Sequence, residues 1–267
     1  MTTTAPIFTK ETIQQLFLKV DELLLLQFEK AWKKTQIRND GTRSLMKTTA
    51  KAKNVGCAGS TGTVLFLNDL SEPEIGRIGW VGDSRAVGIE KNGTVIELTQ
   101  DHTPDRPDET ERVRKAGGTV NRKGRLNNSL AVSRGFGDRP HKNPLTGVMA
   151  EKTYAVQMSS ALLACPDVVE FDRKEMAIVL IASDGVWDVV SNEEAMTFLL
   201  RETSKCNVAA AVQGEVKDGE TEVVGGVNND GMKGLQIAVE RLVQLSIDRG
   251  SQDNVSAIAV WCLKNKQ

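Results

Sequence analysis

Apolar and polar positions along the chain follow a helical period at both ends and a strand-like period between them. Apolar side chains recur every three or four residues over 11–34 and again from Leu235 to about Gly250, which predicts an amphipathic helix in each place. Short runs rich in β-branched residues predict strands over 63–67, 75–81, 85–90, 94–98, 167–171, 177–182 and 255–263.

Turn and capping signals fix how these elements connect. Asn92-Gly93 joins two predicted strands by a tight hairpin, and consecutive hairpins indicate an antiparallel sheet. A short helix is predicted over 108–116, and a capping box at Ser191 and Glu194 predicts another from Ser191 to about Glu202. The whole pattern predicts an α+β domain in which helices cover the outer faces of antiparallel sheets.

The predicted elements form one domain over residues 1–267, with two long segments that lack a sustained period. Residues 35–54 are polar and basic and are predicted to form a loop after the first helix, within an N-terminal part of 1–58. Residues 205–234 are rich in Gly, Asn, Asp and Val and are predicted to be a surface insertion.

Composition narrows the classes of function. The 267 residues carry 34 basic and 35 acidic side chains, so the basic excess typical of nucleic-acid binding is lacking. The four cysteines, Cys57, Cys165, Cys206 and Cys262, are too widely spaced in the sequence for a thiolate zinc site. With no signal peptide and no long apolar run, we expect an intracellular protein of the cytoplasm or nucleus, without nucleic-acid or membrane partners.

Three acidic turns each lie at the end of a predicted strand, and they contain Asp83, Asp184 and Asp253. Carboxylates brought together from distant parts of a chain can bind a hard divalent cation, which prefers oxygen ligands. Asp-Gly and Asp-Asn are also ordinary turn sequences, so both interpretations stay open from these residues alone. Asp188, four residues after Asp184, is either a further ligand or a surface residue.

Other chemistry has weaker support. His102, just past a strand, is predicted to make a structural hydrogen bond, and His141 is predicted to lie in a surface loop. Neither has the sequence neighbours of a nucleophilic triad. The segment 59–63, GSTGT, lacks the lysine of a phosphate-binding loop and leads into a strand, which excludes that motif.

Taken together, residues 59–260 resemble the metal-dependent type 2C protein phosphatases. The resemblance rests on eight strings in the family's order: GSTGT, VGDSRAV, LTQDHTP, ERVRKAGGTV, LAVSRGFGD, CPDV, IASDGVWDVVSNEE and RGSQDNVSAIAV. It implies a four-layer αββα fold, in which two antiparallel sheets lie between helices.

The resemblance also implies hydrolysis of phosphoserine and phosphothreonine in proteins, with two Mg²⁺ or Mn²⁺ ions between the sheets. In the family, residues that match Asp184 and Asp253 are metal ligands, and those that match Asp83 and Asp188 serve a further, weaker metal. Residues 139–164 would form the flap beside the active site. Phosphorylated proteins are the partners implied, and a monomer is the expected state.

One departure from the family is large. Active members carry, before the first of these strings, an Arg for phosphate, a Glu and an Asp-Gly-His-Gly-Gly turn that supplies the bridging carboxylate and an acid. Nothing before Gly59 matches it, since Asn39-Asp40-Gly41-Thr42 contains no His. We therefore expect an N-terminally truncated domain with no identified catalytic residue and one cation or none, because a shared anion makes close cations tolerable. The alternative is a catalytically impaired pseudophosphatase that binds phosphoproteins or a kinase partner.

Overall fold

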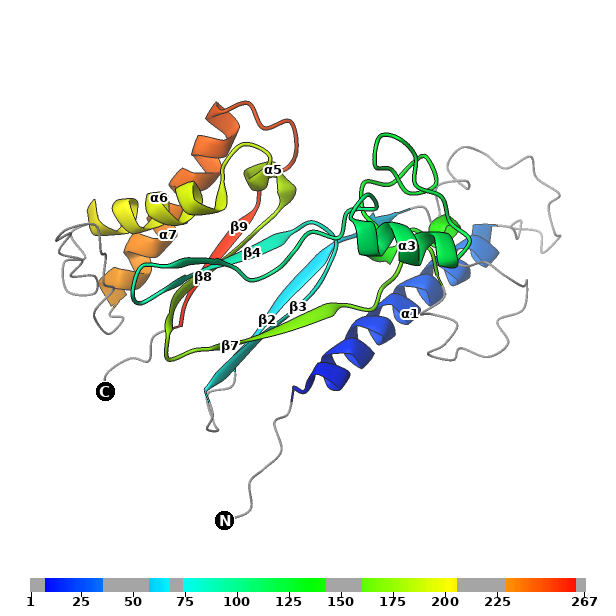
Figure 1. The fold of residues 1–267 in the computed structure, drawn as a ribbon, viewed down its shortest axis with the longest axis horizontal. Coiled ribbons are helices and arrows are strands. Elements are labelled where there is room, and N and C mark those ends of the chain that lie inside the picture. The colour runs from blue at the N-terminus through cyan, green and yellow to red at the C-terminus, as the bar shows by residue number, and fades with distance from the viewer. Residues whose placement is uncertain (1–7, 36–57, 68–73, 143–159, 206–228, 263–267) are drawn as a thin grey trace, which may run out of the picture.

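The computed structural model describes residues 8–35, 58–67, 74–142, 160–205 and 229–262 (Figure 1). The helices are α1 (Lys10–Thr35), α3 (Pro107–Lys115), α5 (Asp184–Trp187), α6 (Asn192–Lys205) and α7 (Asn229–Asp248), with a 3₁₀ turn, η1, at Arg139–His141. The strands are β1 (Gly59–Ser60), β2 (Gly62–Leu67), β3 (Ile75–Val81), β4 (Arg85–Glu90), β5 (Val95–Glu97), β6 (Phe136–Gly137), β7 (Asp167–Asp172), β8 (Met176–Ala182) and β9 (Ala257–Trp261).

The strands form two main antiparallel sheets. We call the sheet of order β2-β3-β7 sheet C and the sheet of order β5-β4-β8-β9 sheet D, and β1 pairs separately with β6. The turn at Asn92-Gly93 joins β4 and β5 as a hairpin, in which Gly93 has φ +88°. All of the pairings between these strands are antiparallel, as the turn signals predicted.

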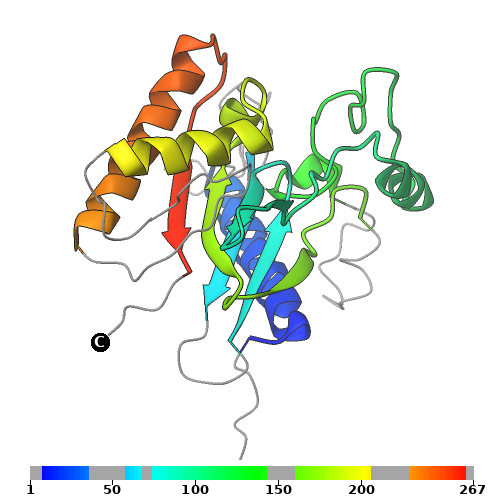
Figure 2. The same ribbon diagram turned by 60° about the vertical axis from the view of Figure 1, so that its left-hand side comes forward.

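The layers follow from the alternation of side chains along the strands. On β8, Ile178 and Leu180 pack with α6 and α7, whereas Val179 packs between the sheets with Ile78 and Trp80 of β3. On the far side, Ile13 and Phe17 of α1 pack with Val81 on the outer face of sheet C. The order is therefore α1, sheet C, sheet D and the α6–α7 pair, the predicted four-layer αββα arrangement (Figures 1 and 2).

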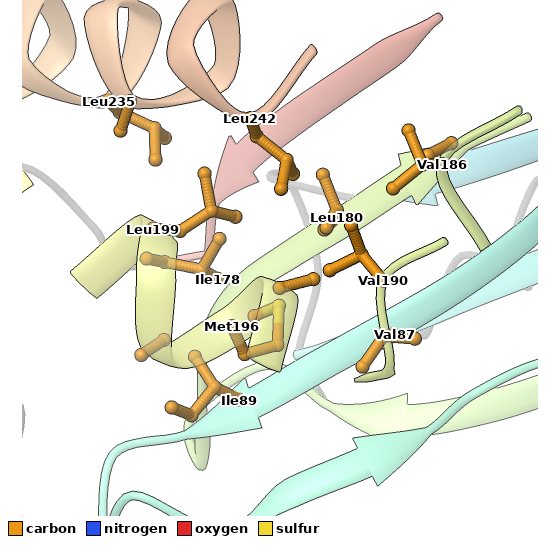
Figure 3. Close-up of a cluster of buried hydrophobic side chains, with 14 residues drawn as sticks. Val87, Ile89, Ile178, Leu180, Val186, Val190, Met196, Leu199, Leu235 and Leu242 are labelled. Carbon is orange, nitrogen blue, oxygen red and sulfur yellow. The ribbon is translucent and has the colours of Figure 1, made fainter. Parts of the chain in front are cut away.

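The largest buried cluster lies under α6 and α7. Its labelled side chains come from β4, β8, the α5 region and both helices, and they converge from opposite sides on one apolar layer (Figure 3). Leu180, Leu199 and Leu242 are fully buried there. This layer holds the end of β8 and the start of α5 in place, and that junction carries Asp184.

Several segments differ from their predicted bounds. α7 begins at Asn229 and Lys205 ends α6, so both ends of the predicted insertion 205–234 are helical, and 206–228 lie outside the described residues. The predicted loop 35–54 lies outside them as well, apart from Thr35, which ends α1. β5 and β9 are shorter than predicted, and Leu263 is outside the described part.

The predicted flap, 139–164, divides into three parts. Residues 139–142 form η1 and its end, and 143–159 lie outside the described residues. Leu162 and Leu163 are almost fully buried, so the last residues of the range belong to the core. Of the helices described, none combines the length and apolar character needed to cross a membrane.

Candidate active site

The register of sheet D brings the acidic turns to the same end of three neighbouring strands, which we call the acidic edge. Arg85 pairs with Ala182, and Ala182 pairs with Ala257, so β4 and β9 begin where β8 ends. Asp83 precedes β4, Asp184 follows β8, and Asp253 precedes β9. The sequence alone predicted that each carboxylate ends a strand, and the pairing places these ends side by side.

The charges of these carboxylates act on one another. Burial, followed by the neighbouring Asp184 carboxylate, raises the pKa of Asp83 to about 6. Burial and then the Asp253 carboxylate raise the pKa of Asp184, and Asp188 adds to this effect. Asp184 thus interacts with all three of the other predicted ligands, and the site concentrates negative charge that a cation would relieve.

Asp184 occupies a different local structure from the predicted turn. Ser183 is the N-cap of the one-turn helix α5, and Asp184 is its first residue, with one carboxylate oxygen accepting the Gly185 N–H at 2.9 Å. In the loop before β9, Asp253 accepts the Asn254 N–H in the same way, at 2.7 Å. Each carboxylate therefore keeps an oxygen free of this local bond, and Asp253 is exposed to solvent.

A second group of side chains supports the Asp83 turn from β4. The Arg85 guanidinium donates to both carboxylate oxygens of Asp101, at 3.0 and 2.8 Å, and to Asn192 Oδ1 at 2.8 Å. It also lies 5.4 Å from the ring centroid of Trp187, in cation–π geometry. The Arg85 side chain is thus held by Asp101, Asn192 and Trp187.

His102 supports the same turn through a hydrogen bond to its backbone. Its ring is fully buried and stacks on Trp80, with 5.5 Å between ring centroids. Nδ1 accepts the Gly82 N–H at 3.2 Å, and Nε2 lies 3.1 Å from Asp167 Oδ2, so the neutral Nε2–H form satisfies both contacts. Burial lowers the pKa of His102, and the predicted structural role is what the structure shows. His141, by contrast, is partly buried in η1 instead of lying in an exposed loop.

The donor chemistry of these residues fits Mg²⁺ or Mn²⁺, since both prefer carboxylate oxygens. Among the residues described, however, no group of three or more Asp, Glu, His or Cys side chains is arranged to hold a metal ion. Asp83, Asp184, Asp188 and Asp253 are therefore candidate ligands by the chemistry of their oxygens and by their place at neighbouring strand ends.

Sequence reasoning missed the residues that hold the two central turns together. The Ser183 hydroxyl donates to the Asn254 carbonyl at 3.0 Å and accepts the Ser256 N–H at 3.1 Å. A string of eight or ten residues contains no signal for bonds that connect positions 71 and 73 residues apart. Asp101 and Asn192, the partners of Arg85, were missed for the same reason.

The chain is similar to known protein phosphatases. The family model for protein phosphatase 2C matches residues 4–255. The probable protein phosphatase 2C 11 of Arabidopsis thaliana is 32% identical over 218 residues, which is 81% of this chain and 44% of that protein. The bovine protein phosphatase 1L is 34% identical over 142 residues, covering 52% of this chain and 35% of its own length.

A solved structure shows that this similarity extends to the fold. A phosphatase from a pathogenic strain of Toxoplasma gondii superposes with a TM-score of 0.53 at 26% identity, covering 72% of this chain and 49% of that one. The chain thus spans less than half of the length of the curated relatives it matches.

Proposed function

Because this chain belongs to the protein phosphatase 2C family, we propose that it hydrolyses phosphoserine and phosphothreonine in proteins at the acidic edge of sheet D. One observation carries the location: the strand register that puts Asp83, Asp184 and Asp253 at the same edge. The family match, over residues 4–255, covers β4, β8 and the turns that carry the carboxylates.

The residues divide into holding and supporting roles. Asp184 and Asp253 would hold Mg²⁺ or Mn²⁺, and Asp83 and Asp188 would bind a further, weaker cation or attract the first one. When bound, such a cation acidifies a water molecule and offsets the charge of the phosphoryl oxygens. The chain's own contribution is to keep the carboxylates close: Arg85 and His102 hold the turn before β4, and Ser183 holds the turns around β8 and β9.

A second candidate function is a pseudophosphatase that keeps the fold and binds phosphoproteins or a kinase partner. The observation that favours it is the lack, among the described residues, of a three-carboxylate group for a metal ion. The same acidic edge would then bind a cation weakly and without turnover, and the protein partner would be recognised by other surfaces.

Turnover with Mn²⁺ separates these two functions. We expect the enzyme to hydrolyse p-nitrophenyl phosphate and a phosphothreonine peptide in the presence of Mn²⁺, and D184N combined with D253N to abolish this activity. Chelation of the metal should abolish it as well. Hydrolysis no faster than that of the double variant, in a chain that still binds the phosphopeptide, would favour the pseudophosphatase.

A further inference from the structure

Ser183 lies between the two turns that carry the central carboxylates. It lies between the end of β8 at Ala182 and Asp184, and its hydroxyl reaches across to the loop before β9. We call its two side-chain hydrogen bonds, to the Asn254 carbonyl and from the Ser256 N–H, the Ser183 bridge. The backbone adds a third link, because the Ser183 N–H donates to the Ser256 carbonyl at 3.0 Å.

The bridge uses the hydroxyl as donor and acceptor at once. A hydroxyl group has one O–H to give and two lone pairs to receive, so a single oxygen can join a carbonyl and an N–H of the opposite turn. Alanine can do neither, and water would then solvate both backbone groups in this half-exposed place. The loss would leave the backbone link intact and free the Asn254 end of the loop.

A close contact on the next residue makes the same junction tight. A Cβ built on Gly185 would lie 2.6 Å from the Asn254 carbonyl oxygen, closer than real contacts allow. Gly185 is buried at this point and takes an ordinary backbone conformation, so space is the reason for glycine there. The Ser183 bridge and the Gly185 contact therefore meet on one peptide group, the one between Asn254 and Val255.

We propose that Ser183 is a positioning residue, whose bridge sets the spacing between the Asp184 and Asp253 carboxylates and thereby the affinity for a divalent cation. The inference rests on the proposed function only in taking this pair as the metal-holding one. Asp184 and Asp253 are each next to a residue of the junction, so a shift of the Asn254 peptide moves one carboxylate relative to the other. Groups that orient metal ligands typically change metal affinity by about 10–100-fold when removed.

The direct test is Mn²⁺ binding by the unmodified chain and its variants, measured from the electron paramagnetic resonance of free Mn²⁺. We expect S183A to weaken Mn²⁺ binding about tenfold or more. S183T keeps the hydroxyl and should bind within about threefold of the unmodified chain. The matched control is S191A, which also removes a serine hydroxyl that accepts a backbone N–H. Ser191 Oγ accepts the Glu194 N–H at 3.2 Å, in the cap of α6. S191A should leave Mn²⁺ affinity unchanged.

A background variant adds a second check. The bridge does not touch the turn before β4, so S183A should weaken Mn²⁺ binding by the same factor in a D83N chain. Should S183A fail to fold by circular dichroism, S183C takes its place with the same expectation, because a thiol is only a weak donor and acceptor.

The outcomes separate this inference from the proposed function. Unchanged Mn²⁺ affinity in S183A, an equal loss in S191A, or no Mn²⁺ uptake by the unmodified chain would each overturn the positioning role. A chain that binds Mn²⁺ in a Ser183-dependent way but hydrolyses no phosphoester would refute the proposed function and leave the role of Ser183 standing.

Discussion

At the scale of single residues, Glu109 of α3 accepts more side-chain hydrogen bonds than any other carboxylate in the described part of the chain. It is 1% exposed and accepts hydrogen bonds from Arg112, Arg134 and the Ser133 hydroxyl. Burial on its own would raise the pKa of Glu109, but the bonds from Arg112 and Arg134 outweigh it and lower the pKa to about 2. The ionised form is therefore the one that the fold selects.

We predict that E109Q lowers the free energy of unfolding by about 3 kcal/mol near neutral pH, because it leaves buried Arg134 short of an anion. The folded pKa lies below the ordinary value of 4.5, so this contribution is present above that value and disappears as the pH falls towards about 2. Urea unfolding of both proteins at several pH values measures the difference. The control is E111Q, on the exposed face of α3, which should change little, and a gap between E109Q and the unmodified chain that persists in strong acid would contradict the prediction.

At the scale of elements, α1 approaches sheet C where β3 has a glycine. A Cβ built on Gly79 would lie 2.6 Å from Cγ2 of Ile13 and 3.4 Å from the ring of Phe17. Both of these side chains are buried, so they have little room to retreat. The glycine thus sets the distance between the helix and the sheet.

We predict that G79A destabilises the chain by about 1–3 kcal/mol, because the added methyl group overpacks the contact with α1. In an I13A background the atom that it meets is gone, and the same substitution should cost less by about 1 kcal/mol or more. Thermal or urea unfolding of the four proteins of this cycle gives the coupling. Additive effects of the two substitutions would show that α1 adjusts its position freely.

Elements with a strong local pattern were predictable from the sequence, and the junctions between them were not. The buried strand β8 and the hairpin at Asn92-Gly93 follow from runs and turns of a few residues. The sequence predicts that the last helix begins at Leu235, whereas α7 begins at Asn229. Its first turn contains Asn229, Asp230 and Gly231, which are poor helix formers. The acidic turns were found as separate strand ends, whereas the Ser183 bridge depends on a register that only the folded sheet sets.

At the scale of the whole molecule, β4 and β8 are the best protected elements of sheet D. Each is hydrogen-bonded to a strand on both sides, and each is covered by the α6–α7 pair on one face and by sheet C on the other. β9 has only one strand neighbour among the described residues, and Ile258 on it is 65% exposed. The protection of backbone amides from hydrogen exchange should therefore fall from the central strands of the sheet to the edge strand β9.

We predict that backbone amides of β8 exchange with deuterium only through global unfolding, and at least about tenfold more slowly than amides of β9. Hydrogen exchange followed by nuclear magnetic resonance at increasing urea concentrations measures both strands. Exchange of β8 that is insensitive to urea would indicate local opening and would contradict the layered arrangement as the source of stability.

The position of β9 at the edge has a consequence for which changes of length the protein can tolerate. Moving a strand by one residue relative to its neighbour displaces it by about 3.3 Å and turns every side chain to the opposite face. Because Asp253 is placed by the alignment of Ala257 with Ala182, the length of the segment from Gly250 to Ala257 fixes the spacing between the last helix and the site. A single-residue insertion between Asp253 and Ala257, or the deletion of one residue between them, would keep every aspartate in the sequence and still separate Asp253 from Asp184, so alignments of relatives should allow no gap between these two positions.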